Sequence, residues 1–410
     1  DVNNIPNTYN QTESRFGIRG TDLGNSFKHN NKTYFLFGDT LRVNQAKEQE
    51  NLDSIAFTVS MCAKNGLTLE FGKQPPLISG GENITQDGFN VPLDGFSLDD
   101  NMYVFFSSNH YEIPFGYDQM GRSLLAICTD EEQYTFRYIA DFSKDKFSNV
   151  SIIQDMPAEE YGLTRSEPGL FIWGSGRYRS SDVYLAFLPY SEIKRHTQGF
   201  HRNLSAIFFS GLDANNKPMW SPWEENAVAL FKSGCIGELS VRYNWFIKRF
   251  IITYNSVNPR GILLRMSQKP WGNWSDHFML FDGWNIDDAA FLGHKGFGRF
   301  IHMGDNKEHK QDHLQDDLIP FQDRSNSFGG EYGPYQVASY TTGIENVFTK
   351  LYFTMSTWNP YQVMLMYAII PAEGNELTKT AEEYAAFDPN CNLGCSPFKR
   401  FRSRAKRTGI

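Results

Sequence analysis

Short runs in which hydrophobic and polar residues alternate recur along the whole chain and end in turn-forming residues. Such period-two alternation is typical of strands that bury one face. Five segments share a fuller pattern, in which a short strand, a polar turn and an aromatic-rich strand follow one another. The pattern predicts five antiparallel hairpins. Their second strands align on Tyr34, Tyr103, Tyr184, Phe250 and Tyr352.

The first strands of four hairpins begin at intervals of 71–73 residues, at Asp22, Asp94, Glu167 and Glu238. The fifth begins near Tyr340, after a polar segment at about 294–333 that lengthens the last interval. A repeat of this size, with several strands per unit and no helical periodicity, predicts an all-β, five-bladed β-propeller from about residue 12 to 372. Stacked repeats of another shape are the alternative, but solenoid repeats are usually shorter.

The segment from 373 to 410 is expected to be a C-terminal extension. It contains one short helix candidate, "AEEYAAF", and a basic tail with six Lys or Arg residues between Lys399 and Arg407. Such a tail is typical of a solvated, disordered end, and the alternative is an anchor to an anionic surface.

Composition agrees with this prediction and narrows the function. Aromatic residues make up 15% of the chain and glycines number 34, as strands and repeated tight turns require. The net charge of −8 argues against nucleic acid as the main partner. No apolar run reaches the roughly 18 residues that a membrane-spanning helix needs.

The sequence predicts no metal and no cofactor. It contains no P-loop, no GxSxG and no GxGxxG opening a helix. Cys62, Cys128 and Cys235 are expected as separate buried thiols, whereas Cys391 and Cys395 could form a local disulfide or stay free. Four histidines of the polar segment match no metal motif, namely His294, His302, His309 and His313.

Asp22 and Asp39 frame the first predicted hairpin. A two-residue turn at Asn30 and Asn31 would place the two aspartates opposite each other on neighbouring strands. Two carboxylates this close favour protonation of one of them, which supplies the acid and the base that glycoside hydrolysis needs. The alternative is that each aspartate only caps a turn through its own side chain.

Further residues are predicted to complete an acidic channel mouth. Glu167 is expected to join the catalytic pair, either by tuning it or by holding the substrate. The residues predicted to bind substrate are Asp94, Arg165, Trp173, Glu238, Tyr340 and Trp358. The alternatives are packing between blades for the three aromatic residues and an ion pair for Arg165.

The segments "GTDLGNSF...YFLFGDT" and "YFTMSTWNPYQVMLM" resemble a family of five-bladed propellers long catalogued as a domain of unknown function. The resemblance covers about residues 15 to 370. Members of that family include endo-D-arabinanases, which cut the α-D-arabinofuranan of mycobacterial cell walls. The resemblance implies a secreted, cell-surface or periplasmic inverting endo-glycosidase whose acid and base are Asp22 and Asp39, without fixing which is which.

Other functions stay open at this stage. The chain could be a glycosidase acting on another furanose or pyranose polymer, a glycan-binding propeller without activity, or a platform for protein interactions. Retention of both Asp22 and Asp39 favours an enzyme, and the acid-lined mouth favours a polysaccharide as the partner. The residues do not fix the sugar, the linkage, the anomeric outcome or the oligomeric state.

Overall fold

The computed structural model describes residues 10–392, apart from 43–51, 65, 74–76, 82, 87–89, 109–110, 114–116, 120, 157–161, 164–166, 200–202, 283–329 and 359–360. Arg165, the four histidines between 294 and 313, Cys395 and the basic tail therefore lie outside the described residues.

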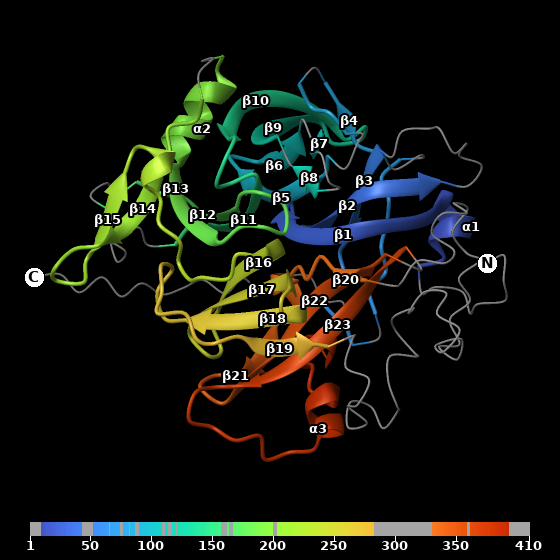
Figure 1. Ribbon diagram of the computed structural model, residues 1–410. Helices are drawn as coiled ribbons and strands as arrows, with labels where there is room; N and C mark the ends of the chain where they lie inside the picture. Colours follow the sequence, from blue (N-terminus) through green and yellow to red (C-terminus); the bar gives the residue numbers. More distant parts are fainter. Residues whose placement is uncertain are drawn as a thin grey trace, which may run out of the picture.

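Five sheets surround a common centre, as Figure 1 shows, and the predicted five-bladed β-propeller is confirmed. Blade 1 contains β1 (Ile18–His29), β2 (Lys32–Arg42) and β3 (Leu52–Thr58). Blade 2 contains β4 (Ser79–Gly80), β5 (Pro92–Leu98), β6 (Asn101–Ser108), β9 (Arg122–Asp130) and β10 (Thr135–Ser143). Blade 3 contains β11 (Asn149–Gln154), β12 (Gly169–Ser175), β13 (Val183–Pro189), β14 (Ile207–Leu212) and β15 (Pro218–Ser221).

The last two blades follow the same plan. Blade 4 contains β16 (Ile236–Asn244), β17 (Arg249–Val257), β18 (Arg260–Ser267) and β19 (Phe278–Phe281). Blade 5 has an inner edge made of β20 (Glu331–Tyr332) and β21 (Thr342–Ile344), which pair with opposite ends of β22 (Phe348–Thr357), and then β23 (Gln362–Pro371). A separate hairpin joins β7 (Tyr111–Ile113) to β8 (Tyr117–Gln119).

Helices are short and lie outside the blades. They are α1 (Thr12–Phe16), α2 (Tyr190–Thr197) and α3 (Ala381–Ala386), with 3-10 turns η2 (Glu224–Asn226), η3 (Ala338–Tyr340) and η4 (Pro389–Asn392). The predicted helix at "AEEYAAF" is α3, and Thr380 begins it with a capping box. In the described part of the chain, no helix has the length and apolar character needed to cross a membrane.

The inner strands of the blades meet at the centre through hydrogen bonds. The backbone N–H of Ile152 in β11 donates to Asp94 of β5 at 2.9 Å, and that of Val241 in β16 donates to the Ser151 hydroxyl at 2.9 Å. The Arg242 guanidinium contacts Asp94 at 3.1 Å and Asn25 of β1 at 3.2 Å. Four blades are thus tied together around the guanidinium of Arg242, whose side chain is 13% exposed.

One blade begins earlier than the repeat predicts. Its inner strand is β11, and β12 is the second strand. Glu167 precedes β12 and is therefore not on an inner strand, so its predicted placement is wrong. Strands β12 and β13 of blade 3 have the same spacing and aromatic content as the first two strands of the other blades, which explains the error.

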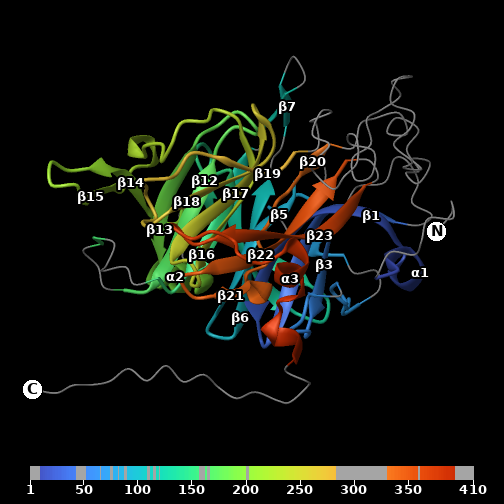
Figure 2. The same ribbon diagram turned by 90° about the horizontal axis from the view of Figure 1, so that it is seen from below.

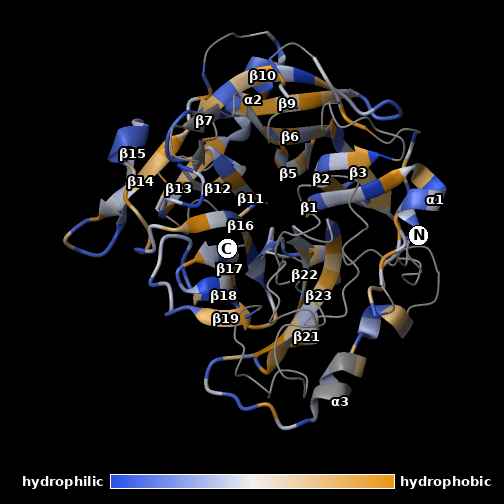
Figure 3. Ribbon diagram, turned by 45° about the vertical axis from the view of Figure 1, so that its right-hand side comes forward, coloured by the Kyte–Doolittle hydropathy of each residue, from blue (hydrophilic) through white to orange (hydrophobic). Residues whose placement is uncertain are grey.

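Apolar side chains fill the space between the sheets. Figure 3 shows hydrophobic segments within strands such as β9 and β14 and hydrophilic segments in the loops around them. Ring pairs connect neighbouring strands and blades: Phe96 stacks on Tyr103 at 5.1 Å, and Trp173 packs against Phe250 at 5.8 Å. The high aromatic content therefore serves blade packing first.

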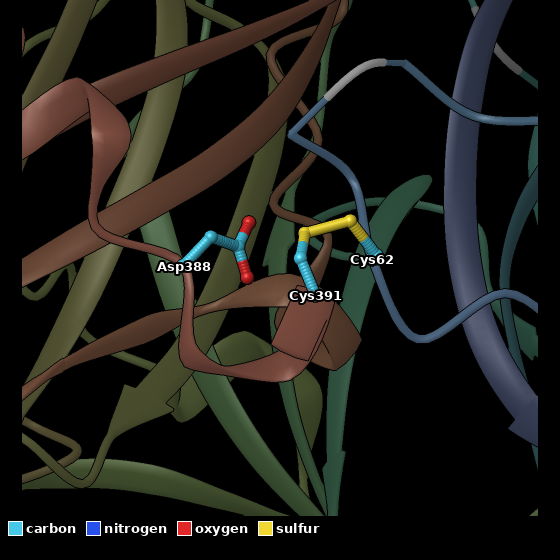
Figure 4. A group of neighbouring side chains, drawn as sticks. All are labelled: Cys62, Asp388 and Cys391. Carbon is cyan, nitrogen blue, oxygen red and sulfur yellow. A yellow bond between two sulfur atoms is a disulfide. The ribbon is translucent and has the colours of Figure 1, made fainter. Parts of the chain in front are cut away.

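The first and last blades close the ring side by side. The backbone N–H of Thr21 donates to the carbonyl of Tyr361 at 3.2 Å, and that of Leu23 donates to the Ser356 hydroxyl at 2.8 Å. A disulfide between Cys62, after β3, and Cys391 adds a covalent link. Figure 4 shows this bond beside Asp388.

The disulfide corrects the prediction for the cysteines. Cys62 is not a separate thiol, and Cys391 pairs with a partner 329 residues away instead of with Cys395. Cys128 and Cys235 are buried free thiols, as predicted. The segment that carries Cys391 packs on blade 5, where the Tyr384 ring lies 4.8 Å from that of Phe348.

Candidate active site

The hairpin β1–β2 turns at Asn30 and Asn31, which have φ angles of 45° and 62°. Both lie in the left-handed region that asparagine tolerates, so the predicted two-residue turn is confirmed. The pairing further along differs by one residue, since Asp22 lies opposite Gly38 and not opposite Asp39.

A bulge in β1 causes this shift. Leu23 pairs with Phe37 but Asn25 pairs with Leu36, which leaves one extra residue in β1. Leu23 has a φ of 65° and Asp39 a φ of 32°, both unusual for residues with a side chain. Bulges and strained residues gather next to active sites, where they re-aim a side chain. The positive φ angle of Asp39 therefore indicates that this residue has a functional role.

Gly38 is required at this place because of its close neighbours. A Cβ atom at residue 38 would lie 2.7 Å from the Oδ1 atom of Asp22 and 2.7 Å from a methyl group of Val91. Both contacts are closer than real Cβ atoms allow. Gly38 thus leaves the room that the Asp22 carboxyl occupies.

Asp22 is 5% exposed and Asp39 is 4% exposed. The Tyr332 hydroxyl of β20 donates to the Oδ2 atom of Asp22 at 2.8 Å. Burial raises the pKa of Tyr332 well above its usual value, and the charge of Asp22 raises it further. Tyr332 therefore keeps its proton and orients the Asp22 carboxyl.

A third carboxyl, which sequence reasoning missed, lies in the same blade. Asp53 of β3 is 0% exposed and accepts a hydrogen bond from the Gln86 side chain at 3.2 Å. Burial raises the pKa of Asp53 well above its usual range, and the neighbouring charges of Asp39 and Asp22 raise it further. The three aspartates therefore belong to one group that spans β1, β2 and β3.

Glu238 of β16 extends this acidic region into blade 4. It is 5% exposed, and its Oε1 atom accepts hydrogen bonds from the Tyr178 hydroxyl at 2.7 Å and from Arg179 at 3.1 Å. Burial raises the pKa of Tyr178 well above its usual value; the Arg179 charge opposes this shift, and the charges of Glu238 and Asp22 add to it. Asp22 and Glu238 therefore lie on the same side of the propeller.

We call this side the acidic face, defined by Asp22, Asp39, Glu238 and Glu331. Glu331 neighbours Tyr332 in β20 and lies 3.9 Å from the Arg260 guanidinium. Sequence reasoning missed Tyr178, Arg179, Arg260, Glu331 and Tyr332. Tyr178 and Arg179 lie in a turn, and the others follow no repeat, so no periodic signal marks them.

Glu167 lies at the other side. Asn149 at the start of β11 donates to the carbonyl of Gly237, next to Glu238, and Asn149 pairs with the last residue of β12. The first residue of β12 is therefore at the far end of the blade. Glu167 precedes it and accepts a hydrogen bond from Ser191 at 2.6 Å, at the start of α2. Figure 2 shows α2 and α3 on the side of the molecule away from the hairpin that contains β7.

Three residues predicted to bind substrate have other surroundings. Asp94 is the partner of Arg242 at the centre of the propeller and is fully buried there. Trp173 is 0% exposed, and its indole N–H donates to the carbonyl of Pro270 at 3.1 Å. Tyr340 is buried and donates to the carbonyl of Ser60 at 2.7 Å. None of the three offers surface to a ligand.

Trp358 lies at the acidic face and is partly exposed. It follows β22 directly after Thr357, which pairs with Glu331. Its ring lies 5.8 Å from that of Tyr361, nearly perpendicular to it. Trp358 is thus the predicted aromatic residue whose position fits contact with a ligand.

A cavity of about 1120 Å³ lies away from this face. It is lined by residues such as Ser267, at the end of β18, and Pro371, at the end of β23. Arg260 at the other end of β18 contacts Glu331 of the acidic face. A smaller cavity of about 240 Å³ lies between blades 1 and 5, and Thr21, the sequence neighbour of Asp22, and Tyr361 help to line it.

Among the described residues, one group of possible metal ligands lies close together, formed by Cys62, Asp388 and Cys391. Both sulfur atoms belong to the disulfide, so they are not available as thiolate ligands. The Asp388 carboxyl accepts a hydrogen bond from the Tyr352 hydroxyl at 3.0 Å. This group is structural.

The fold and the acidic face define a five-bladed propeller with carboxyl groups gathered at one side of its centre. The chain belongs to the family described as "Domain of unknown function (DUF4185)", which it matches over residues 7–367. No curated protein matches the chain.

Several solved structures match the chain. A candidate hydrolase from Bacteroides ovatus ATCC 8483 is 11% identical, with 88% of each chain covered and a TM-score of 0.53. A family 117 glycoside hydrolase from Zobellia galactanivorans is 10% identical, covering 93% of this chain and 95% of its own, with a TM-score of 0.41. An α-L-arabinofuranosidase from Clostridium thermocellum ATCC 27405 is 8% identical, covering 86% and 95%, with a TM-score of 0.39. At 11% sequence identity, the likeness to the candidate hydrolase from Bacteroides ovatus supports the fold alone.

Proposed function

We propose that the protein is a glycoside hydrolase that uses Asp22 and Asp39 as its acid–base pair. The observation that carries the proposal is the position of two buried carboxyl groups on neighbouring strands, next to a bulge with a left-handed aspartate. Their burial and strain are costly for a fold that has no use for them. Turn capping alone does not account for Asp22, which accepts a hydrogen bond from Tyr332 of another blade.

The chemistry follows from the two carboxyl groups. One, protonated, donates its proton to the glycosidic oxygen as the bond to the anomeric carbon breaks. The other, ionised, takes a proton from the water that attacks that carbon from the opposite side. We expect inversion, which requires carboxyl groups about 6.5–9.5 Å apart so that the water fits between base and sugar.

We further propose that the substrate is an α-D-arabinofuranan cut at internal linkages. The resemblance of the "TDLG" and "GDT" motifs to those of endo-D-arabinanases supports this choice. Trp358 at the acidic face is the proposed stacking residue. The alternatives are a propeller glycosidase acting on another furanose or pyranose polymer and a glycan-binding propeller without activity.

A second acid–base arrangement has one specific observation in its favour. Among the described residues, the Oε2 atom of Glu238 has no hydrogen-bond partner although it is buried. Glu238 shares the acidic face with Asp22, so a pair that spans two blades could use these two residues. Glu167, on the other side of the propeller, has no place in either arrangement.

We also propose that the protein acts outside the cytoplasm, in the periplasm, at the cell surface or after secretion. The disulfide between Cys62 and Cys391 supports this proposal because disulfides persist mainly in oxidising compartments. A polysaccharide of the cell wall would be within reach there.

A panel of glycans tests the proposal. The protein is incubated with arabinofuranans and with other furanose and pyranose polymers, and released oligosaccharides are separated by chromatography. We expect oligosaccharides of several lengths from an α-D-arabinofuranan, as an endo-acting enzyme produces. Glycan binding without release would favour the non-catalytic alternative, and release from another polymer would correct the substrate.

A further inference from the structure

We propose that Asp53 is a positioning residue of the proposed site and that it holds Asp39 in its bulged, left-handed conformation. This inference rests on the proposed function, because it assigns Asp39 a role in turnover. Asp53 lies on β3, one strand further from the channel than Asp39.

The pairing of β2 with β3 places Asp53 opposite the bulge. Phe37 pairs with Ser54, and the next pair is Thr40 with Leu52. Gly38 and Asp39 therefore face Asp53 alone, which is the two-against-one arrangement of a β-bulge. The other edge of β2 also has a two-against-one bulge, since Gly38 pairs with Asp22 and the next pair is Leu41 with Gly20. Asp39 is thus the residue around which both pairings shift.

The neighbours of Asp53 suit a residue that stabilises the bulge at Asp39. The Asp53 carboxyl lies beside the backbone of Asp39 and interacts with it electrostatically, and the φ of 32° at Asp39 is unfavourable without support from its surroundings. The Gln86 amide, from the segment before blade 2, donates to the Oδ2 atom of Asp53 at 3.2 Å. Asp53 is 0% exposed, so water neither replaces the Gln86 amide nor screens the interaction with Asp39. The bulge is therefore held from the side away from the channel.

The charge state agrees with this role. The pKa of Asp53 is raised by burial first and then by Asp39 and Asp22. A neutral Asp53 keeps its acceptor oxygens but adds no third negative charge beside the proposed acid–base pair. An asparagine in its place would preserve both properties, whereas an alanine would remove the acceptor.

The experiment compares Asp53→Ala, Asp53→Asn and Asp388→Ala with the wild type. Asp388→Ala is the matched control, because it removes another buried carboxyl, one that lies outside the site and accepts a hydrogen bond from Tyr352. Two quantities are measured: kcat and KM on the glycan that the wild type cleaves, and the hydrogen-exchange rate of the Asp39 amide in protein with ¹⁵N-labelled aspartate.

We expect Asp53→Ala to lower kcat by about 10- to 100-fold with little change in KM, because misplacement of a reacting group affects mainly the chemical step. Its Asp39 amide should exchange about tenfold faster, because the bulge opens more easily when Asp53 no longer packs beside it. Asp53→Asn and Asp388→Ala should stay near the wild type in both measurements.

Each outcome decides something. Wild-type kcat and wild-type exchange in Asp53→Ala would overturn the inference, and so would a large loss of kcat in a folded Asp53→Asn. If Asp53→Ala does not fold, Gln86→Met replaces it, and unchanged kcat and exchange in that variant would overturn the inference. If the wild type cleaves no glycan, the proposed function fails, while the exchange rates still decide whether Asp53 holds Asp39.

Discussion

The disulfide between Cys62 and Cys391 should contribute strongly to stability, because it closes nearly the whole chain into a loop. The two cysteines are 329 residues apart. The chain-entropy relation gives about 6 kcal/mol for a loop of that length, and removal of natural disulfides typically costs about 2–5 kcal/mol. The bond also fastens blade 1 to the segment packed on blade 5, so its loss should loosen the junction where the ring closes.

The assay is urea unfolding of the wild type and of the double variant Cys62→Ser/Cys391→Ser, followed by fluorescence. We expect the free energy of unfolding to fall by about 2–5 kcal/mol in the variant. A reducing agent should lower it by a similar amount in the wild type and leave the variant unchanged. The matched control is Cys128→Ser, which alters a buried free thiol. Equal stability with and without reductant in the wild type would refute the reasoning.

Three further predictions concern single residues. Gly38→Ala should lower the free energy of unfolding by about 1–3 kcal/mol through overpacking, and turnover should fall with it; a variant as stable and active as the wild type would contradict the contacts of Gly38. Asp53→Asn should become more stable relative to the wild type as pH rises above about 4, by up to about 1.4 kcal/mol per pH unit. The reason is that only the wild type has a carboxyl at residue 53 whose pKa is raised by folding, so only the wild type loses stability as that carboxyl is forced to ionise. Unfolding at several pH values checks this, and a difference in stability that does not change with pH would contradict it. Trp173→Ala should destabilise the fold by about 3–5 kcal/mol, whereas Trp358→Ala should raise KM with little effect on melting temperature; the opposite result would exchange their roles.

Much of the fold could be predicted because its signal is local and repeated. Alternation, polar turns and aromatic second strands recur in every blade, and the turn at Asn30 and Asn31 follows from what asparagine tolerates. The count of five blades was correct although one was misaligned. Glu167 precedes a strand that has the right spacing and composition, and alternation alone does not distinguish the first strand of a blade from the second.

The candidate site was only partly predictable, because it is built from contacts distant in sequence. Asp22 and Asp39 could be found from one hairpin. The bulge that shifts the pairing by one residue, so that Asp22 faces Gly38, could not be predicted. Asp53 and Tyr332 join the site from other strands. Cys62 and Cys391 are brought together only when the first and last blades close the ring.

Turnover of Asp22→Asn and Asp39→Asn on the cleaved glycan, with Glu167→Gln as control, tests the central claim most directly. The account predicts that each asparagine variant loses about 100- to 10,000-fold in kcat, because each removes a proton transfer from the reaction. Glu167→Gln, on the far side of the propeller, should keep wild-type turnover. Circular dichroism should show the same fold in all three variants. Near-normal turnover in folded Asp39→Asn would contradict the account and would move the second carboxyl of the pair to Glu238.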